Sequence, residues 1–447
     1  MKHIKNPLIT GTLILTSAGF LSRIIGFFYR IFISHTYGEE GMGIFQLITP
    51  VMALSFSLCC AGIQTSVSKY IAAQTASKNK QSTTAILLSS LALTLTLSTF
   101  TSIIVYINSS FLAKEILLEE RTAPLLRILA FSFPLSSIHC CINGYFYGIK
   151  NAKIPAFLQL SEQIFRVFSV YLITSIVILN NQIPELAIAV VGLVIGECSS
   201  ALLSFIFLFS SYYKKEPLHD TKKQVHHLLP LVRYWSKKLI FMAAPLSGSR
   251  IIVNLLQSVE SIYIPNKLQA YGLLKADALS VYGVLTGMAL SLILFPSAIT
   301  NSISVLLLPI VSAAEENKQN HTISKAINKS ITYCALLGGI CTLFFFLFGR
   351  MIGNILFHSS LCGEYITTLS FICPFLYITT TLNSILHGLG KTITTFFINV
   401  TALSIRILFV FFLIPKIGII GYLIGLLLSQ FFSSVFCIIC LRKYRVY

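Results

Sequence analysis

The chain has 447 residues, of which 55% are hydrophobic and only 11% are charged, and its mean hydropathy is +0.81. A soluble protein of this length would need far more polar surface, so the composition excludes ordinary soluble enzymes and binding domains. The formal net charge is +18. These values predict an all-α polytopic membrane protein with basic segments outside the hydrocarbon.

Apolar stretches of about 20 residues, the length that crosses roughly 30 Å of hydrocarbon as a helix, recur along the whole chain. We expect about twelve membrane-spanning helices. In chain order they lie near 8–33, 43–68, 84–108, 125–148, 156–179, 186–212, 239–264, 279–311, 330–350, 366–389, 393–414 and 418–440.

The distribution of lysine and arginine predicts the orientation. If the N-terminus lies in the cytoplasm and the spans alternate, inner segments carry about three times as many Lys and Arg as outer loops. Both termini are therefore expected inside, in a bacterial cytoplasmic membrane. The net positive charge is explained by topology and by attraction to anionic membrane lipids, so we expect no nucleic-acid partner.

The sequence also repeats itself. Ser22-Arg23-Ile24-Ile25 is echoed by Ser249-Arg250-Ile251-Ile252. Five residues recur 240 positions later: Pro134, Asn143, Gly148, Phe157 and Arg166 as Pro374, Asn383, Gly388, Phe397 and Arg406. Each half has an even number of spans, so the repeats are parallel. We expect a six-helix lobe at 1–213, a basic cytoplasmic linker at 214–238, and a second six-helix lobe at 239–447.

Three arginines are candidates for binding an anionic substrate. Arg23 and Arg30 are seven residues apart, so they project from one helix face about 10 Å apart along its axis. Arg250 matches Arg23 in the second half. Guanidinium groups bind phosphate oxygens in pairs, which favours a phosphate-bearing substrate in a cavity. The alternative is that Arg30 reaches the outer face and that Arg23 pairs with a carboxylate.

The other charged residues within spans have several possible roles. Glu162 precedes Arg166 by one turn, which predicts a structural ion pair. Arg406, the repeat mate of Arg166, has no such neighbour in its own helix. Glu197 and Glu260 are candidates for coupling to H+ or Na+, or for buried counter-ions to the arginines.

Sites for enzyme or cofactor chemistry are not predicted. The cysteines are scattered through apolar helices, and Cys437-Ile-Ile-Cys440 has C-x-x-C spacing without a second ligand pair. No paired carboxylates, nucleophile elbow or metal cluster appears in the sequence. His139 and His387 are expected to pack or hydrogen-bond rather than to bind a ligand. Five prolines within spans are expected to provide bends: Pro50, Pro134, Pro245, Pro296 and Pro374.

The first seventy residues resemble a known family. Gly11–Ala72, with the Ser-Arg-x-x-Gly-Phe core at Ser22–Phe27 and with Gly38-Glu-Glu-Gly-Met-Gly43, is similar to the opening of the stage V sporulation protein B family. That family belongs to the multidrug/oligosaccharidyl-lipid/polysaccharide (MOP) exporter superfamily. MurJ-type lipid II flippases share the Arg-x-x-Gly-Phe element. The resemblance implies a MATE/MurJ-like fold and a place for Arg23 in the substrate cavity.

The resemblance further implies a flippase that moves an undecaprenyl-linked sugar precursor outward by alternating access. The expected cargo is a precursor of peptidoglycan, spore cortex or another polysaccharide, carried on an anionic pyrophosphate lipid. Longer relatives have two more spans, which line a groove for the lipid tail. Three alternatives stay open: a capsule or O-antigen flippase, a cation-coupled multidrug exporter of the MATE type, and a non-transporting membrane scaffold in sporulation.

Overall fold

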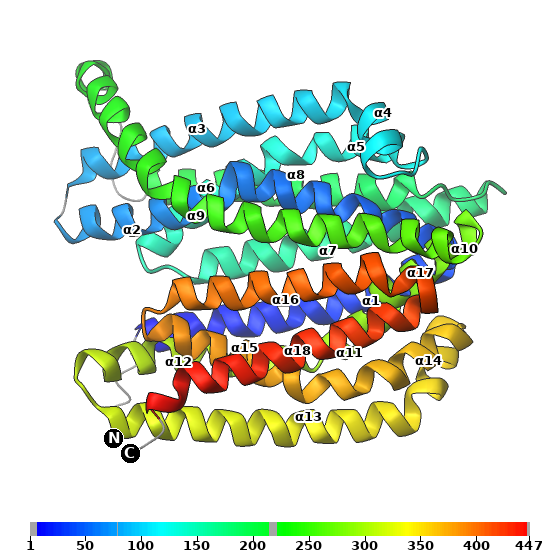
Figure 1. The fold of residues 1–447 in the computed structure, drawn as a ribbon. Coiled ribbons are helices and arrows are strands. Elements are labelled where there is room, and N and C mark those ends of the chain that lie inside the picture. The colour runs from blue at the N-terminus through cyan, green and yellow to red at the C-terminus, as the bar shows by residue number, and fades with distance from the viewer. Residues whose placement is uncertain (1–6, 78, 214–220, 445–447) are drawn as a thin grey trace. The chain divides into compact units, whose positions relative to one another are not determined.

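The computed structural model describes residues 7–77, 79–213 and 221–444, and these residues form helices with no β-strand. The part before the middle of the chain contains α1 (Pro7–Phe56), α2 (Gly62–Ala76), α3 (Lys80–Ile107), α4 (Ser109–Phe111), α5 (Thr122–Ala130), α6 (Ser132–Gly148), α7 (Lys153–Leu179) and α8 (Ala187–Tyr213) (Figure 1). A π-helical segment, Ser57–Ala61, joins α1 to α2.

The second part begins with α9 (Thr221–Tyr271), and its helices run to Leu441. They are α10 (Lys275–Gly283), α11 (Leu290–Leu294), α12 (Ser297–Glu316), α13 (Asn320–Phe357), α14 (Ser360–Leu369), α15 (Cys373–Gly388), α16 (Thr392–Phe412), α17 (Ile414–Ile417) and α18 (Ile419–Leu441). The described residues contain 12 helical stretches long and apolar enough to cross a membrane, which confirms the expected number.

The limits of three predicted spans differ clearly from the structure. The first two predicted spans form one helical stretch, Gly11–Ala76, which contains a non-helical residue at Gly38 (φ 71°, ψ −174°) and the π-helical segment Ser57–Ala61. The predicted span at 279–311 is instead two stretches, Lys275–Leu294 and Ser297–Glu316. Pro296 explains this break, because its ring cannot continue the helix of α11 and instead begins α12.

The bend at Gly38 depends on glycine. Its φ/ψ values lie in a region that side chains almost never occupy, so Gly38→Ala should lower stability by about 1–3 kcal/mol. The measurement is the thermal unfolding midpoint of the purified protein in detergent. Gly19→Ala is the matched control, because nothing lies within 4 Å of an added Cβ in the regular helix there. Equal midpoints for the two variants would contradict the requirement for glycine at position 38.

By packing, the chain divides into two units. The first consists of Met1–Ile25 with Ile48–Leu255, and the second of Gly26–Leu47 with Leu256–Tyr447. This division differs from the expected lobes, since part of α1 packs with the C-terminal half and the first part of α9 packs with the N-terminal half. In the second unit, for example, the ring of Phe27 on α1 lies 5.4 Å from that of Phe295.

Each unit repeats the same helix pairs. In the first, α6 packs against α2, α3 and α8, and α7 packs against α8. In the second, α15 packs against α12, α13 and α18, and α16 packs against α18. The repeat-related Pro134 and Pro374 each lie in the first turn of a helix that follows a break, as expected for bends, whereas Pro50 lies inside α1. The internal repeat is thus present in the packing as well as in the sequence.

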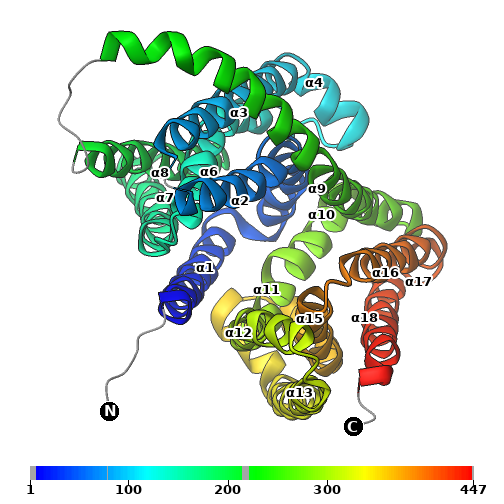
Figure 2. The same cartoon turned by 90° about the vertical axis from the view of Figure 1, so that its left-hand side faces the viewer.

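The expected linker is largely helical. Its residues 214–220 lie outside the described residues, but α9 already begins at Thr221. Figure 2 shows that α9 passes beside α3 after its first turns. Trp235 is buried, with its ring 5.4 Å from that of Tyr70, and the Ser89 hydroxyl donates to the carbonyl of Val232 over 3.0 Å. Apolar residues of the linker therefore belong to the core of the first unit.

Candidate functional site

Five arginines lie well inside the expected spans, and they fall into two groups. Arg166 and Arg406 are repeat mates on α7 and α16, and each contacts carboxylates inside its own unit. For Arg23, Arg30 and Arg250, by contrast, no ion pair with a carboxylate exists among the described residues. Arg166 and Arg406 are therefore neutralised by carboxylates in the structure. Arg23, Arg30 and Arg250 have no such counter-charge among the described residues.

In the first unit, Arg166 lies in a polar cluster built by three helices. Its Nη2 is 2.5 Å from Oε1 of Glu162, one turn earlier on α7. Glu197 on α8 places Oε2 at 3.2 Å from Nδ1 of His139 on α6. Ligand atoms of His139, Glu162 and Glu197 all lie within 4.8 Å of one another. Glu162 and Arg166 are thus part of a larger polar group, in which His139 contacts the carboxylate of Glu197.

Two glycines allow α7 and α8 to approach at this cluster. A Cβ added to Gly192 would lie 2.1 Å from Cγ2 of Val170, and one added to Gly196 would lie 3.0 Å from the carbonyl oxygen of Glu162. Small residues four apart are a common way for membrane helices to pack closely. The corresponding helix of the second unit, α18, has Gly421 and Gly425 in close contact with Leu413 and Phe409.

This close approach gives a testable prediction. Gly192→Leu should push α8 away from α7 and lower stability by about 1–3 kcal/mol, because overpacking a tight contact displaces its neighbours. The thermal unfolding midpoint in detergent reports the change. Gly339→Leu on α13 is the control, since nothing lies within 4 Å of its added Cβ. A midpoint for Gly192→Leu that matches the control would mean that the helices pack differently.

In the second unit, Arg406 is neutralised by a different helix. Its Nη1 is 3.3 Å from Oε1 of Glu260 on α9, and the Tyr422 hydroxyl of α18 donates to the same oxygen over 2.8 Å. The side chains of Glu260 and Arg406 are 7% and 17% exposed. Of the two roles expected for Glu260, the geometry supplies that of a counter-ion.

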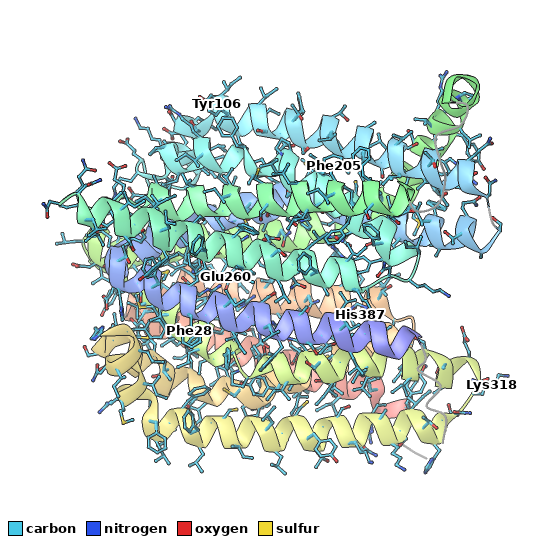
Figure 3. All side chains as sticks on the ribbon, turned by 180° about the vertical axis from the view of Figure 1, so that it is seen from behind. Phe28, Tyr106, Phe205, Glu260, Lys318 and His387 are labelled. Atoms are coloured by element: carbon cyan, nitrogen blue, oxygen red, sulfur yellow. The ribbon has the colours of Figure 1, made fainter. Side chains whose placement is uncertain are left out.

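His387 takes no part in this pair. Figure 3 labels Glu260 and His387 and shows them well separated along the second unit. Sequence reasoning did not find Tyr422, and it treated His139 and His387 alike. A weak signal for Tyr422 was available, because it lies between Gly421 and Gly425, where α18 approaches α16.

The unpaired arginines are accessible to different extents. Arg23 and Arg250 are exposed, and Arg30 is partly buried. On α9, Ala243 and Ser247 contact Gly62, and the Asn254 side chain donates to the carbonyl of Ala53 over 3.1 Å. Arg250 lies on the same stripe of the helix, three residues after Ser247 and four before Asn254. It therefore projects on the side of α9 that packs within the first unit.

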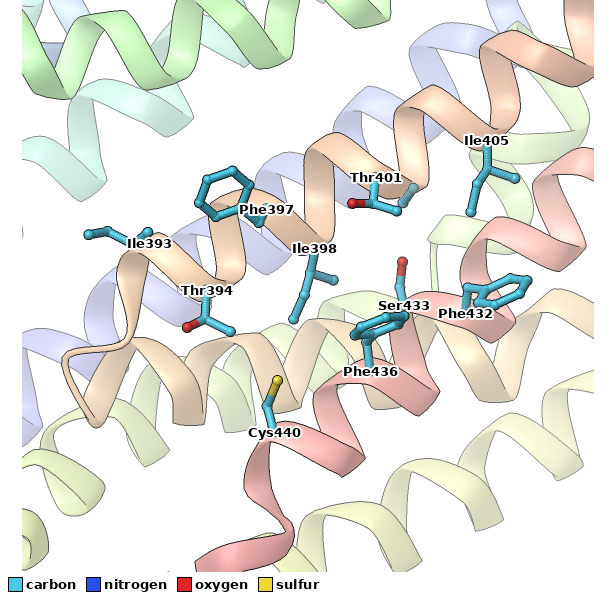
Figure 4. Close-up of a pocket in the computed structure, with 11 residues that line it drawn as sticks. Ile393, Thr394, Phe397, Ile398, Thr401, Ile405, Phe432, Ser433, Phe436 and Cys440 are labelled. Carbon is cyan, nitrogen blue, oxygen red and sulfur yellow. The ribbon is translucent and has the colours of Figure 1, made fainter.

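An apolar cavity of about 270 Å³ lies between α16 and α18 in the second unit (Figure 4). Its eleven lining residues include Phe397, Phe432 and Phe436, and the only polar groups are hydroxyls and one thiol, as on Thr401 and Cys440. The wall carries no charge, so this cavity suits hydrocarbon and not an anionic head group.

Comparison with known proteins first defines the class. A MATE family transporter of the MOP superfamily, solved in an inward-facing conformation, aligns over 97% of both chains with a TM-score of 0.66 at 15% identity. Lipid II flippase MurJ, solved in an inward-closed conformation, aligns over 96% of this chain and 87% of its own with a TM-score of 0.65, also at 15% identity. The fold is therefore shared with these two solved transporters, and the described residues contain 12 helical stretches long and apolar enough to cross a membrane.

The sequence comparison then gives the family. The polysaccharide biosynthesis protein profile matches residues 8–313, which is more than half of the chain. Stage V sporulation protein B of Bacillus subtilis (strain 168) is 28% identical over 423 residues, covering 93% of this chain and 80% of its own. The chain belongs to the polysaccharide biosynthesis protein family.

Proposed function

We propose that the protein is a flippase for a polyprenyl-linked sugar precursor that carries a pyrophosphate. The proposal rests on three arginines within the expected spans, Arg23, Arg30 and Arg250, which have no carboxylate partner among the described residues. Two others, Arg166 and Arg406, are paired with carboxylates. An arginine kept unpaired in an apolar helix needs an anion, and a pyrophosphate supplies adjacent oxygens in the geometry that guanidinium binds.

The relatives support this cargo class. Stage V sporulation protein B is similar over nearly the whole chain, and the fold matches that of a lipid II flippase. A cationic drug would require surplus negative charge at its binding site. Arg23 and Arg250, which are exposed and lie well inside the expected spans, are positively charged instead.

In the proposed mechanism, Arg23 and Arg250 bind the pyrophosphate and lower the free energy of the charged head within the membrane. Unaided flipping is slow because the head must leave water without compensating contacts. The helix units then rearrange to expose the head to the outer side by alternating access. The polyprenyl tail stays in hydrocarbon throughout, for which the uncharged wall between α16 and α18 is suited.

The test is a lipid II accessibility assay in cells depleted of their own flippases. An enzyme added outside the cells cleaves only the outward-facing precursor. Expression of this protein should restore cleavage. If it does not, although the protein is in the membrane, then lipid II is not the cargo. The same assay with capsule or O-antigen precursors then follows, and failure with all of them would refute the flippase proposal.

A further inference from the structure

The cluster of His139, Glu162, Arg166 and Glu197 in the first unit has an unequal number of opposite charges. It contains two carboxylates and one guanidinium. The guanidinium is held by Glu162, its neighbour on α7, which leaves the Glu197 carboxylate to be balanced by something else. Among the described residues, the one ion-pair contact of the Glu197 carboxylate is with the imidazole of His139, at 3.2 Å.

The second unit serves as an internal reference. There the repeat-related Arg406 faces one carboxylate, Glu260, and the third member is the hydroxyl of Tyr422, which donates a hydrogen bond without adding charge. That cluster is neutral as it stands. The comparison identifies the Glu197–His139 pair as the extra charge-bearing part of the first unit.

Burial makes the imbalance costly. The side chains of His139 and Glu197 are 12% and 14% exposed. Their facing atoms, Nδ1 and Oε2, are buried and find no partner with good hydrogen-bond geometry. A carboxylate in such surroundings must be neutralised or must change its protonation state. One positive charge is therefore needed at this position.

A proton meets this need better than a metal ion does. The nitrogen and oxygen atoms of His139, Glu162 and Glu197 are close enough together to hold a cation. However, Oε1 of Glu162 is already paired with Nη2 of Arg166 at 2.5 Å. A metal ion bound there would lie beside a guanidinium of the same sign. A proton on Nδ1 of His139 needs no extra space and turns the 3.2 Å contact into a charge-assisted hydrogen bond.

The other groups around the pair do not supply the charge. The neighbouring thiols of Cys60 and Cys140 are neutral groups at pH 7, and among the described residues no ion pair joins Arg250 to Glu197. Hydroxyl side chains of α3 contact α6, as in the Ser98–Ser137 contact of 3.0 Å and the Thr94–Cys141 contact of 3.1 Å.

We propose that the first unit contains a proton-binding site, in which one exchangeable proton is held between His139 Nδ1 and Glu197 Oε2. Both side chains keep a small exposed surface. This inference goes beyond the proposed function and does not depend on the cargo. It assigns to the membrane interior a group through which a proton gradient can act on this unit.

The test is nitrogen NMR of protein labelled with ¹⁵N only in histidine, purified in lipid nanodiscs. His139→Gln, or His139→Asn if the first does not fold, identifies the signals of His139. We expect its ring to carry both protons at pH 7 in the wild type and to become neutral in Glu197→Gln. Glu185→Gln, an exposed carboxylate outside the cluster, is the control and should leave the ring charged.

Three results would overturn the proposal. The first is a neutral His139 ring at pH 7 in the wild type. The second is a charged ring that persists in correctly folded Glu197→Gln, because the carboxylate would then not hold the proton. The third is a shift of the His139 signals at constant pH when sodium replaces choline, or on addition of zinc, which would mean that the site binds a metal ion. None of these readouts requires the lipid cargo, so the result is independent of the flippase assay.

Discussion

Arg23→Ala and Arg250→Ala are each expected to lower the rate of precursor flipping by roughly 10–100-fold, measured by the external cleavage assay at matched expression. The magnitude corresponds to the loss of a hydrogen bond to a charged group, about 1.5–3 kcal/mol. Neither arginine has a carboxylate partner among the described residues, so neither substitution leaves a buried charge unpaired. Stability should therefore change little.

Matched variants separate charge from geometry. Arg23→Lys should retain part of the rate, because lysine keeps the charge and loses the paired donors that fit a pyrophosphate. Arg350→Ala removes an exposed arginine at the outer part of α13 and should flip at the wild-type rate. Wild-type flipping by both Arg23→Ala and Arg250→Ala would show that these arginines do not bind the cargo.

Glu260→Leu is expected to destabilise the protein by about 3–5 kcal/mol, the usual cost of removing one partner of a buried ion pair. The substitution leaves the guanidinium of Arg406, 17% exposed, without its carboxylate, and it also removes the acceptor of the Tyr422 hydroxyl. Chemical or thermal unfolding in detergent measures the loss.

The double variant Glu260→Leu with Arg406→Leu tests whether the loss of stability comes from the unpaired guanidinium of Arg406. Replacing a whole buried pair by apolar residues is often neutral, so we expect most of the stability to return. Glu364→Leu, at an exposed carboxylate on α14, is the control for the change in charge and should be close to wild type. A single variant as stable as this control would mean that Arg406 is neutralised in another way.

Features with a local or periodic cause were predictable from the sequence. Hydrophobic runs of membrane length gave the number of spans, and the positional matches around Pro134 and Pro374 gave the repeat that the packing of α6 and α15 shows. The Glu162–Arg166 contact follows from one helical turn. Each of these three features depends on residues close in sequence or on regular spacing, so each can be predicted without knowledge of the fold.

Contacts between distant helices were not predictable. Glu260 and Arg406 are 146 positions apart, and nothing in the sequence chooses between an interfacial, coupling or counter-ion role for Glu260. His139 was expected only to pack or hydrogen-bond, because its partner Glu197 lies on another helix. The packing of the expected linker was not predictable for the same reason. Its basic composition is visible, but the surface on α2 and α3 that buries Trp235 is not.

The central claim is that unpaired intramembrane arginines bind the pyrophosphate of a lipid-linked sugar. The most direct measurement is binding to the purified protein by native mass spectrometry, comparing undecaprenyl pyrophosphate with undecaprenol, which has the same tail and no charge. We expect a clear preference for the pyrophosphate that Arg23→Ala and Arg250→Ala abolish and Arg350→Ala retains. Equal binding of the two lipids, or a preference that both arginine variants retain, would contradict the account.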